Sequence, residues 1–201
     1  GKGGWIYRER APNAKGLYLI GDFNNRDRHS HPLKKINDED WEIFVKGVRT
    51  IPHKSRFKVL VDDGTKIRDR IPLYATRVER DENLDFAAIL ENPRKKFEWT
   101  DEDFKVKKDG LLIYEAHIGL AQEKGGVGTY KEFEKNVLPR IKEAGYNTIQ
   151  LMAIAEHPYY GSFGYQVSSF YAPSSRFGTP EELKELIDEA HKNNIKVIMD
   201  L

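Results

Sequence analysis

The pattern of apolar residues changes near residue 95 of this 201-residue chain. Before that point, short alternating segments are separated by turn residues such as Asn24-Asn25 and Asp62-Asp63-Gly64, which accept tight or left-handed turns. After it, apolar strand-like runs alternate with amphipathic helical segments. We therefore predict an all-β domain followed by an α/β domain. The two patterns of apolar residues belong to different arrangements of secondary structure.

The first 95 residues predict a small, immunoglobulin-like β-sandwich. Regular turn signals between short strands are typical of packed antiparallel sheets. The expected strands are residues 5–9, 16–21, 41–45, 56–61 and 65–69. The segment over residues 96–110 is rich in charged residues, which favours a linker between the two domains. The predicted domains are a sandwich over 1–95, a linker over 96–110 and an α/β domain over 111–201.

Residues 111–201 follow the order strand, helix, strand, helix, strand, which predicts parallel strands joined by crossover helices. Each helix begins with a capping box, Thr129 with Glu132 and Thr179 with Glu182, and Pro139 is expected to interrupt the first helix. The expected strands are residues 111–114, 148–154 and 196–201. A closed eight-fold barrel takes about 250 residues. We therefore expect the first part of a (β/α)8 barrel, truncated in its third strand.

Composition excludes several classes of partner. The 33 Lys and Arg residues balance the 32 Asp and Glu residues, so the basic excess of a nucleic-acid-binding protein is missing. The chain has no cysteine, which rules out disulfides and cysteine-bound zinc and suits the cytoplasm. Its apolar runs are far shorter than the roughly 20 residues that span a bilayer. We expect a cytoplasmic monomer with a neutral partner.

The long loop over residues 155–178 combines aromatic, polar and glycine residues. Such loops at the carboxyl ends of parallel strands hold the sites of barrel enzymes, and sugar rings need flat aromatic faces beside hydrogen-bonding groups. The side chains concerned are those of Glu156, His157, Tyr159, Tyr160, Phe163 and Tyr165. The same aromatic residues could instead pack between domains, and the residues alone leave both interpretations open.

Three further features of the sequence could belong to a catalytic, metal or phosphate site. Asp200, Glu115 and His117 lie at strand ends that point to a barrel's active face, although such residues also serve as structural hydrogen-bonding groups. His29-Ser30-His31 lacks a third metal ligand, and residues 125–129 lack the ending of a phosphate-binding loop. We expect no metal and no cofactor.

Several strings in order resemble the glycogen branching enzymes of the α-amylase superfamily. They are YEAHIG from Tyr114, NVLPRIKEAGYNTIQLMAI from Asn136, EHPYYGSFGYQ from Glu156, RFGTPEEL from Arg176 and VIMDL at the end of the chain. The string APNAKGLYLIGDFNN from Ala11 resembles the carbohydrate-binding sandwich that precedes the barrel in this family. The resemblance covers nearly the whole chain. It implies a transferase that cuts an α-1,4-glucan and passes it to a 6-hydroxyl, forming an α-1,6 branch.

The resemblance also implies roles for individual residues. Tyr165 matches the family's sugar-stacking tyrosine, and Asp200 matches the aspartate that opens its first sequence block. Their expected neighbours in the glucan cleft are Phe163, Gly164, Gln166 and His157. The nucleophile and the acid/base residue of the family would lie beyond Leu201, so the chain is expected to contain no catalytic residue and to be inactive alone.

The expected sugar-binding surface of the sandwich departs from the family pattern. Arg10-Ala11-Pro12 replaces a WAP string, and Arg26 follows Asn24-Asn25 where related modules have tryptophan. Losing both stacking contacts would cost about 1 to 3 kcal/mol of binding free energy. The other positions that match this surface are Asp38, Glu39, Asp40 and Lys58.

Three other kinds of protein share features with this chain. An amylase-like debranching hydrolase shares both domains, and the deciding sequence blocks would lie outside this chain. A non-catalytic glucan-binding protein ending at Leu201 would expose the apolar faces of an open half-barrel. A metal-dependent barrel hydrolase should have His-x-His at the end of its first strand, whereas this chain has Glu115-Ala116-His117.

Overall fold

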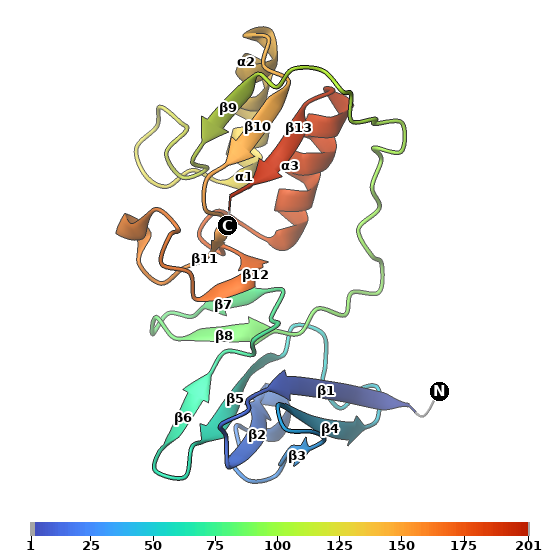
Figure 1. The fold of residues 1–201 in the computed structure, drawn as a ribbon, viewed down its shortest axis with the longest axis vertical. Coiled ribbons are helices and arrows are strands. Elements are labelled where there is room, and N and C mark those ends of the chain that lie inside the picture. Colours follow the sequence, from blue (N-terminus) through green and yellow to red (C-terminus); the bar gives the residue numbers. More distant parts are fainter. Residues whose placement is uncertain (1–2, 201) are drawn as a thin grey trace. The chain divides into compact units, whose positions relative to one another are not determined.

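A computed structural model of the chain describes residues 3–200 and divides it into two compact units, residues 1–94 and 95–201 (Figure 1). In the first unit, antiparallel sheets enclose a core that includes Leu17, Leu19, Trp41, Val45 and Val59. Alternate side chains of each strand face this core. The predicted β-sandwich is therefore confirmed.

One sheet of the sandwich has the order β1-β4-β3, with β1 at Gly4–Arg10, β4 at Asp40–Lys46 and β3 at Lys34–Lys35. The other has the order β2-β5-β8-β7, with β2 at Gly16–Gly21, β5 at Arg56–Asp62, β8 at Phe86–Ile89 and β7 at Val78–Arg80. Strand β6 (Ile67–Arg70) also pairs with β5, and a short 3-10 helix, η1 (Asp22–Asn24), follows β2. Strands β3, β7 and β8 were not predicted, because they have two to four residues each and are too short for a periodic signal.

A buried carboxylate joins the first sheet to strand β6. Glu9 of β1 is 1% exposed and is paired with Arg70 of β6. Tyr7 donates a hydrogen bond to Glu9 at 2.5 Å, and the backbone N–H of Leu73 donates another at 3.1 Å. Burial, and then the nearby Glu9 charge, raise the pKa of Tyr7 well above its ordinary value. The two sheets are thus joined by polar bonds as well as by the apolar core.

We predict that Arg70→Ala lowers the free energy of unfolding of the first unit by about 2 to 3 kcal/mol, because it leaves the buried Glu9 carboxylate without its cation. Arg68→Ala on the same strand is the control, since its pair with Asp63 is exposed and is worth less than about 1 kcal/mol. Urea unfolding followed by the fluorescence of buried Trp41 measures both. Equal losses in the two variants would contradict the prediction.

The second unit contains the parallel sheet β13-β10-β9, with β9 at Ile113–Ala116, β10 at Thr148–Leu151 and β13 at Lys196–Met199. Helices α1 (Tyr130–Asn136), α2 (Leu138–Glu143) and α3 (Pro180–Lys192) make the crossovers, and α3 runs beside β13 (Figure 1). Between β10 and α3 lie β11 (Ala155–Glu156), η2 (Tyr160–Ser162) and β12 (Ser169–Pro173). The predicted strand-helix alternation is confirmed.

Helix boundaries follow the sequence signals closely. Thr129 and Thr179 each cap a helix through a capping box, and Pro139 lies at the break between α1 and α2. The strand predicted over 148–154 ends at Leu151, because Ala153 has a φ of 31° and leaves the extended conformation. The last predicted strand ends at Met199, and Leu201 lies outside the described residues.

The segment expected as a linker, residues 96–110, bonds to α3. Thr100 donates two hydrogen bonds to Asp188 at 2.7 and 2.6 Å, and Asp101 pairs with His191 at 2.5 Å. Phe104 stacks on the same His191 ring, with centroids 4.1 Å apart. Burial acts to raise the pKa of Asp188, but the Thr100 bonds and the Lys192 charge outweigh it and lower that pKa. Much of this segment is therefore held by the second unit.

No helix within residues 3–200 is both long and apolar enough to cross a membrane.

Candidate functional site

The long loop brings Tyr165 to the end of strand β13. The Tyr165 hydroxyl donates a hydrogen bond to Asp200 Oδ2 at 3.0 Å, although the two residues are 35 positions apart. That bond raises the pKa of the Tyr165 phenol, and burial and the negative charges of Asp200 and Glu115 act in the same direction. The structure therefore places together two residues that the sequence singled out separately.

Polar groups at the ends of β9 and β10 extend this site. Glu115 of β9 accepts a hydrogen bond from Gln150 of β10 at 3.1 Å, and the two residues are register partners. Asp200 directly follows β13, on the other side of β10. Because parallel strands end at one edge of the sheet, carboxylate and amide groups collect there.

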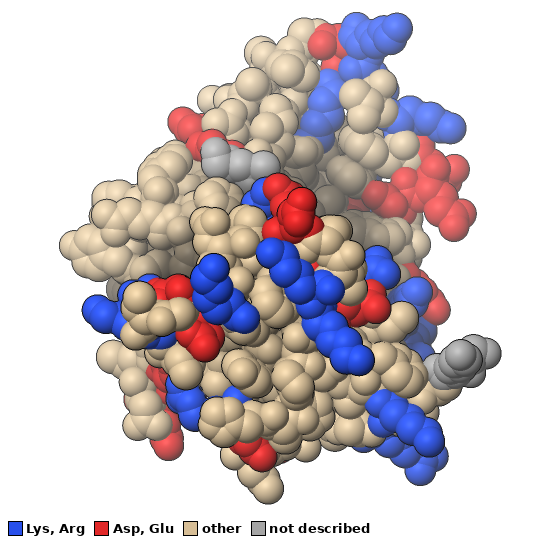
Figure 2. Space-filling view, turned by 60° about the horizontal axis from the view of Figure 1, so that its bottom comes forward, with Lys and Arg blue, Asp and Glu red and all other residues tan. Residues whose placement is uncertain are grey.

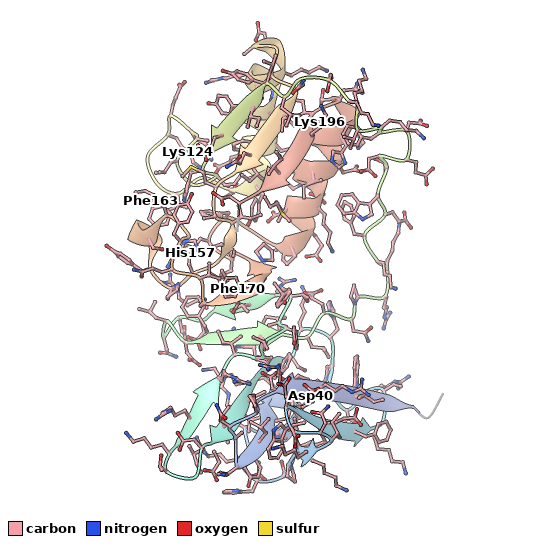
Figure 3. The ribbon with its side chains drawn as sticks, in the orientation of Figure 1. Asp40, Lys124, His157, Phe163, Phe170 and Lys196 are labelled. Atoms are coloured by element: carbon pink, nitrogen blue, oxygen red, sulfur yellow. The ribbon has the colours of Figure 1, made fainter. Side chains whose placement is uncertain are left out.

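Exposed aromatic rings lie on the same loop. Tyr165 is 54% exposed, and Tyr159 and Phe163 are exposed as well. Figure 3 marks Phe163 and His157, which both lie between β11 and β12. Gln166 is exposed next to Tyr165. Flat rings beside hydrogen-bonding groups are the arrangement that binds sugar rings.

The backbone of this loop requires a glycine at position 164. Phe163 and Gly164 both have positive φ, 54° and 93°. A Cβ atom at Gly164 would lie 1.9 Å from the carbonyl oxygen of Ala153, a distance no side chain tolerates. Gly164 is itself buried, so it shapes the loop through its backbone.

The structure does not bring His157 to this surface. Its side chain is 0% exposed, its Nδ1 is 2.9 Å from the Ala155 carbonyl oxygen, and its backbone N–H donates to Glu156. Glu156 is buried too and accepts a hydrogen bond from the backbone N–H of Ser175 at 2.8 Å. The position predicted to bind glucan thus lies beneath the loop.

The residues predicted on the sandwich fall into two groups. In the first, Arg10 makes a two-pronged contact with Glu39 at 3.0 and 2.9 Å. The backbone N–H of Ala11 donates to the Glu39 carbonyl at 2.8 Å, and the carbonyl of Ala11 accepts from buried Trp41. Ala11 is buried and Pro12 exposed, while the turn ahead of Asp40 carries exposed Asp38.

Arg26 and Lys58 form the second group, in a shallow pocket on the other sheet. Arg56, Phe57 and Asp69 also line this pocket, and Lys58 pairs with Asp85 at 2.5 Å. The face shown in Figure 2 likewise carries Lys and Arg interspersed with Asp and Glu. Paired charges of this kind favour hydrogen bonding to a neutral ligand over attraction of a charged one.

Within residues 3–200, no three His, Cys, Asp or Glu side chains lie close enough together to hold a metal ion.

Comparison with known proteins explains both units. Residues 1–75 match carbohydrate-binding module 48 (isoamylase N-terminal domain), and residues 123–201 match the α-amylase catalytic domain. The chain is 50% identical to the 1,4-α-glucan-branching enzyme of Rhizophagus irregularis over 98% of this chain and 29% of that protein. It is 46% identical to the enzyme of the same name from Dictyostelium discoideum, over 100% of this chain and 30% of that protein. Over nearly its whole length, the chain is thus similar to 1,4-α-glucan-branching enzymes.

The family resemblance of the quoted strings is thereby confirmed, as is a sandwich followed by part of an α-amylase barrel. The chain spans about 30% of the length of these branching-enzyme relatives. The pullulanase from Bacillus acidopullulyticus, 19% identical, has a TM-score of 0.77 over 100% of this chain and 28% of that chain. At that identity the likeness shows the fold alone.

His117 lies closer to the candidate site than its sequence position indicated. His117 was interpreted as a structural residue at the end of a strand. In the structure it is 5% exposed and contacts the rings of Tyr160, Phe163 and Phe177. Burial, and then the nearby His157, lower the pKa of His117. Its position after β9 was visible in the sequence, but its aromatic neighbours come from segments 40 or more residues away.

We predict that His117 makes the second unit less stable in mild acid. Its pKa is lowered on folding, so the unfolded chain, with a His pKa near 6.5, binds the proton more readily. Its contribution is therefore constant above about pH 7 and falls as pH decreases below 6.5, by at most about 1.4 kcal/mol per pH unit. Urea unfolding of the wild type and His117→Phe at pH 5 to 7.5 measures the difference. A difference that does not change with pH would contradict the prediction.

Proposed function

We propose that this chain is the glucan-binding part of a 1,4-α-glucan branching enzyme. The parent protein would cut an α-1,4-glucan chain and transfer it to a 6-hydroxyl, forming the α-1,6 branches of glycogen. The observation that carries the proposal is the Tyr165–Asp200 hydrogen bond, formed beside exposed aromatic rings at the carboxyl ends of parallel strands. Relatives that bear this name are 43 to 50% identical to the chain.

The site suits a neutral sugar. The Tyr165 ring offers a flat face for the C–H side of a glucose ring, and its hydroxyl is held by Asp200. The remaining carboxylate lone pairs of Asp200 and Glu115 can accept hydrogen bonds from sugar hydroxyls. Phe163 and Gln166 would extend the contact along the glucan. No metal or organic cofactor enters this scheme, and we propose that the protein acts as a cytoplasmic monomer.

The transfer itself requires two further carboxyl groups about 5 Å apart. One attacks the anomeric carbon and forms a covalent glucosyl ester, while the other protonates the departing 4-hydroxyl. That second group then removes the proton of the acceptor 6-hydroxyl as the ester is displaced. We assign both groups to sequence outside this chain, so the chain alone is proposed to bind glucan without branching it.

We predict that Tyr165→Ala weakens binding of maltoheptaose to this chain about three- to tenfold, because it removes a stacking face worth roughly 0.5 to 1.5 kcal/mol. Tyr165→Phe is the matched control: it keeps the ring and loses only the bond to Asp200, so it should lose less affinity. Calorimetric titration measures both, beside an iodine-stain assay for branching. Branching by this chain alone would refute the placement of the catalytic carboxylates. Equal affinity of the wild type and Tyr165→Ala would refute the site.

The sandwich is proposed as a second, weaker contact for glucan. Arg10 is held by Glu39 through a planar two-pronged contact, so it offers hydrogen bonds where a tryptophan would offer a stacking face.

We predict that Arg10→Trp tightens maltoheptaose binding by the first unit about two- to tenfold, the value of one gained stacking contact. Arg8→Trp is the control, because Arg8 lies on the same strand and is also exposed and paired with a glutamate. Affinity electrophoresis in glycogen gels compares the two variants. The same gain in both would show that any exposed tryptophan suffices and that this surface is not a site.

A further inference from the structure

His117 lies at the centre of a group of aromatic rings under the Tyr165 loop. The centroid of its ring is 5.5 Å from that of Phe177, 5.9 Å from that of Phe163 and 6.0 Å from that of Tyr160. All three contacts are edge-to-face, with interplanar angles of 76° to 87°. This geometry is the favoured one for aromatic pairs. The His117 ring thus fixes the position of Phe163 from one side.

Both ring nitrogens of His117 are buried. Neither Nδ1 nor Nε2 has a hydrogen-bond partner among the described residues. An unpaired buried polar group costs folding free energy, and the same space could hold an apolar ring. The contacts that His117 makes with its aromatic neighbours are therefore those of a flat ring.

The backbone around Phe163 is strained as well. Ala153 has a φ of 31° and Phe163 a φ of 54°, both unusual for residues with a side chain. Gly164 packs so closely on the Ala153 carbonyl that no side chain fits there. Strained residues persist only where their surroundings hold them, and they gather at functional sites. Phe163 and Gly164 immediately precede Tyr165 in the chain.

We propose that His117, together with the contact between Ala153 and Gly164, positions the Phe163-Gly164-Tyr165 turn so that Tyr165 meets Asp200 and presents its ring to glucan. His117 is then a positioning residue, because it acts through Phe163 and Tyr165. Its flat ring and its edge-to-face contacts carry the effect. The role in glucan binding rests on the proposed function, whereas the positioning of Tyr165 is a property of this chain alone.

The titration of the Tyr165 phenol tests the positioning without any ligand. The Asp200 bond raises its pKa, so loss of the bond should lower the pH at which Tyr165 titrates. Difference spectra against Tyr165→Phe isolate this tyrosine from the other nine, and Asp200→Asn gives the value without the charged acceptor. We expect the Tyr165 pKa in His117→Ala to be close to its value in Asp200→Asn. In His117→Phe the Tyr165 pKa should be close to that of the wild type.

Two further variants separate positioning from general loss of stability. Leu186→Ala removes a buried side chain from the same core, so it should lower the melting temperature and leave the Tyr165 titration unchanged. Gly164→Ala alters the loop without touching His117, and it should lower the Tyr165 pKa even if His117→Ala does not fold. The proposal would be overturned if Tyr165 had its wild-type pKa in folded His117→Ala or in Gly164→Ala.

Maltoheptaose titration of the same variants tests the link to function. We expect His117→Ala to weaken binding about as much as Tyr165→Ala, and His117→Phe to stay within about twofold of the wild type. If the wild type does not bind maltoheptaose, the proposed function fails, but the phenol titration still decides the positioning. If His117→Ala loses the hydrogen bond between Tyr165 and Asp200 but keeps full affinity for maltoheptaose, the link between positioning and glucan binding is refuted.

Discussion

The pairing of β10 with β9 on one side and β13 on the other is the constraint on which the candidate site depends. Parallel pairing makes all these strands end at one edge, so Glu115, Gln150 and Asp200 meet there although they are distant in sequence. The loop after β10 then needs only to cross this edge for Tyr165 to reach Asp200. Crossover helices with strong capping boxes hold the strands in this order.

Features with a local cause could be predicted from the sequence. Thr129 and Thr179 were assigned as helix caps because their partners lie three residues away, and the break at Pro139 follows from the missing backbone N–H. The change from sandwich to α/β was visible because the period of apolar residues changes. Tyr165 was selected as an aromatic residue of the long loop and Asp200 by its place at a strand end, and the family resemblance pointed to both. Their mutual hydrogen bond required tertiary structure.

Features that depend on distant packing could not be predicted. The early end of β10 comes from the backbone of Ala153, a residue with no turn propensity of its own, held against Gly164 from another segment. His157 was expected at the glucan surface because its neighbours in sequence are aromatic, yet the β11–β12 hairpin turns it inward. In the same way, Arg26 and Lys58 match the same surface as Arg10 in the sequence but line a pocket on the other sheet.

Two buried polar residues show how satisfaction of hydrogen bonds separates a structural role from a functional one. Glu9 is buried with an arginine, a tyrosine hydroxyl and a backbone N–H around it, so its burial is compensated and it joins two sheets. His117 is equally hidden, but its nitrogens have no partner in the part of the chain that the structure describes. Stability alone would favour an apolar ring at that position. Under the strained loop that carries the sugar-stacking candidate, His117 therefore acts through its ring contact with Phe163 and not through hydrogen bonds.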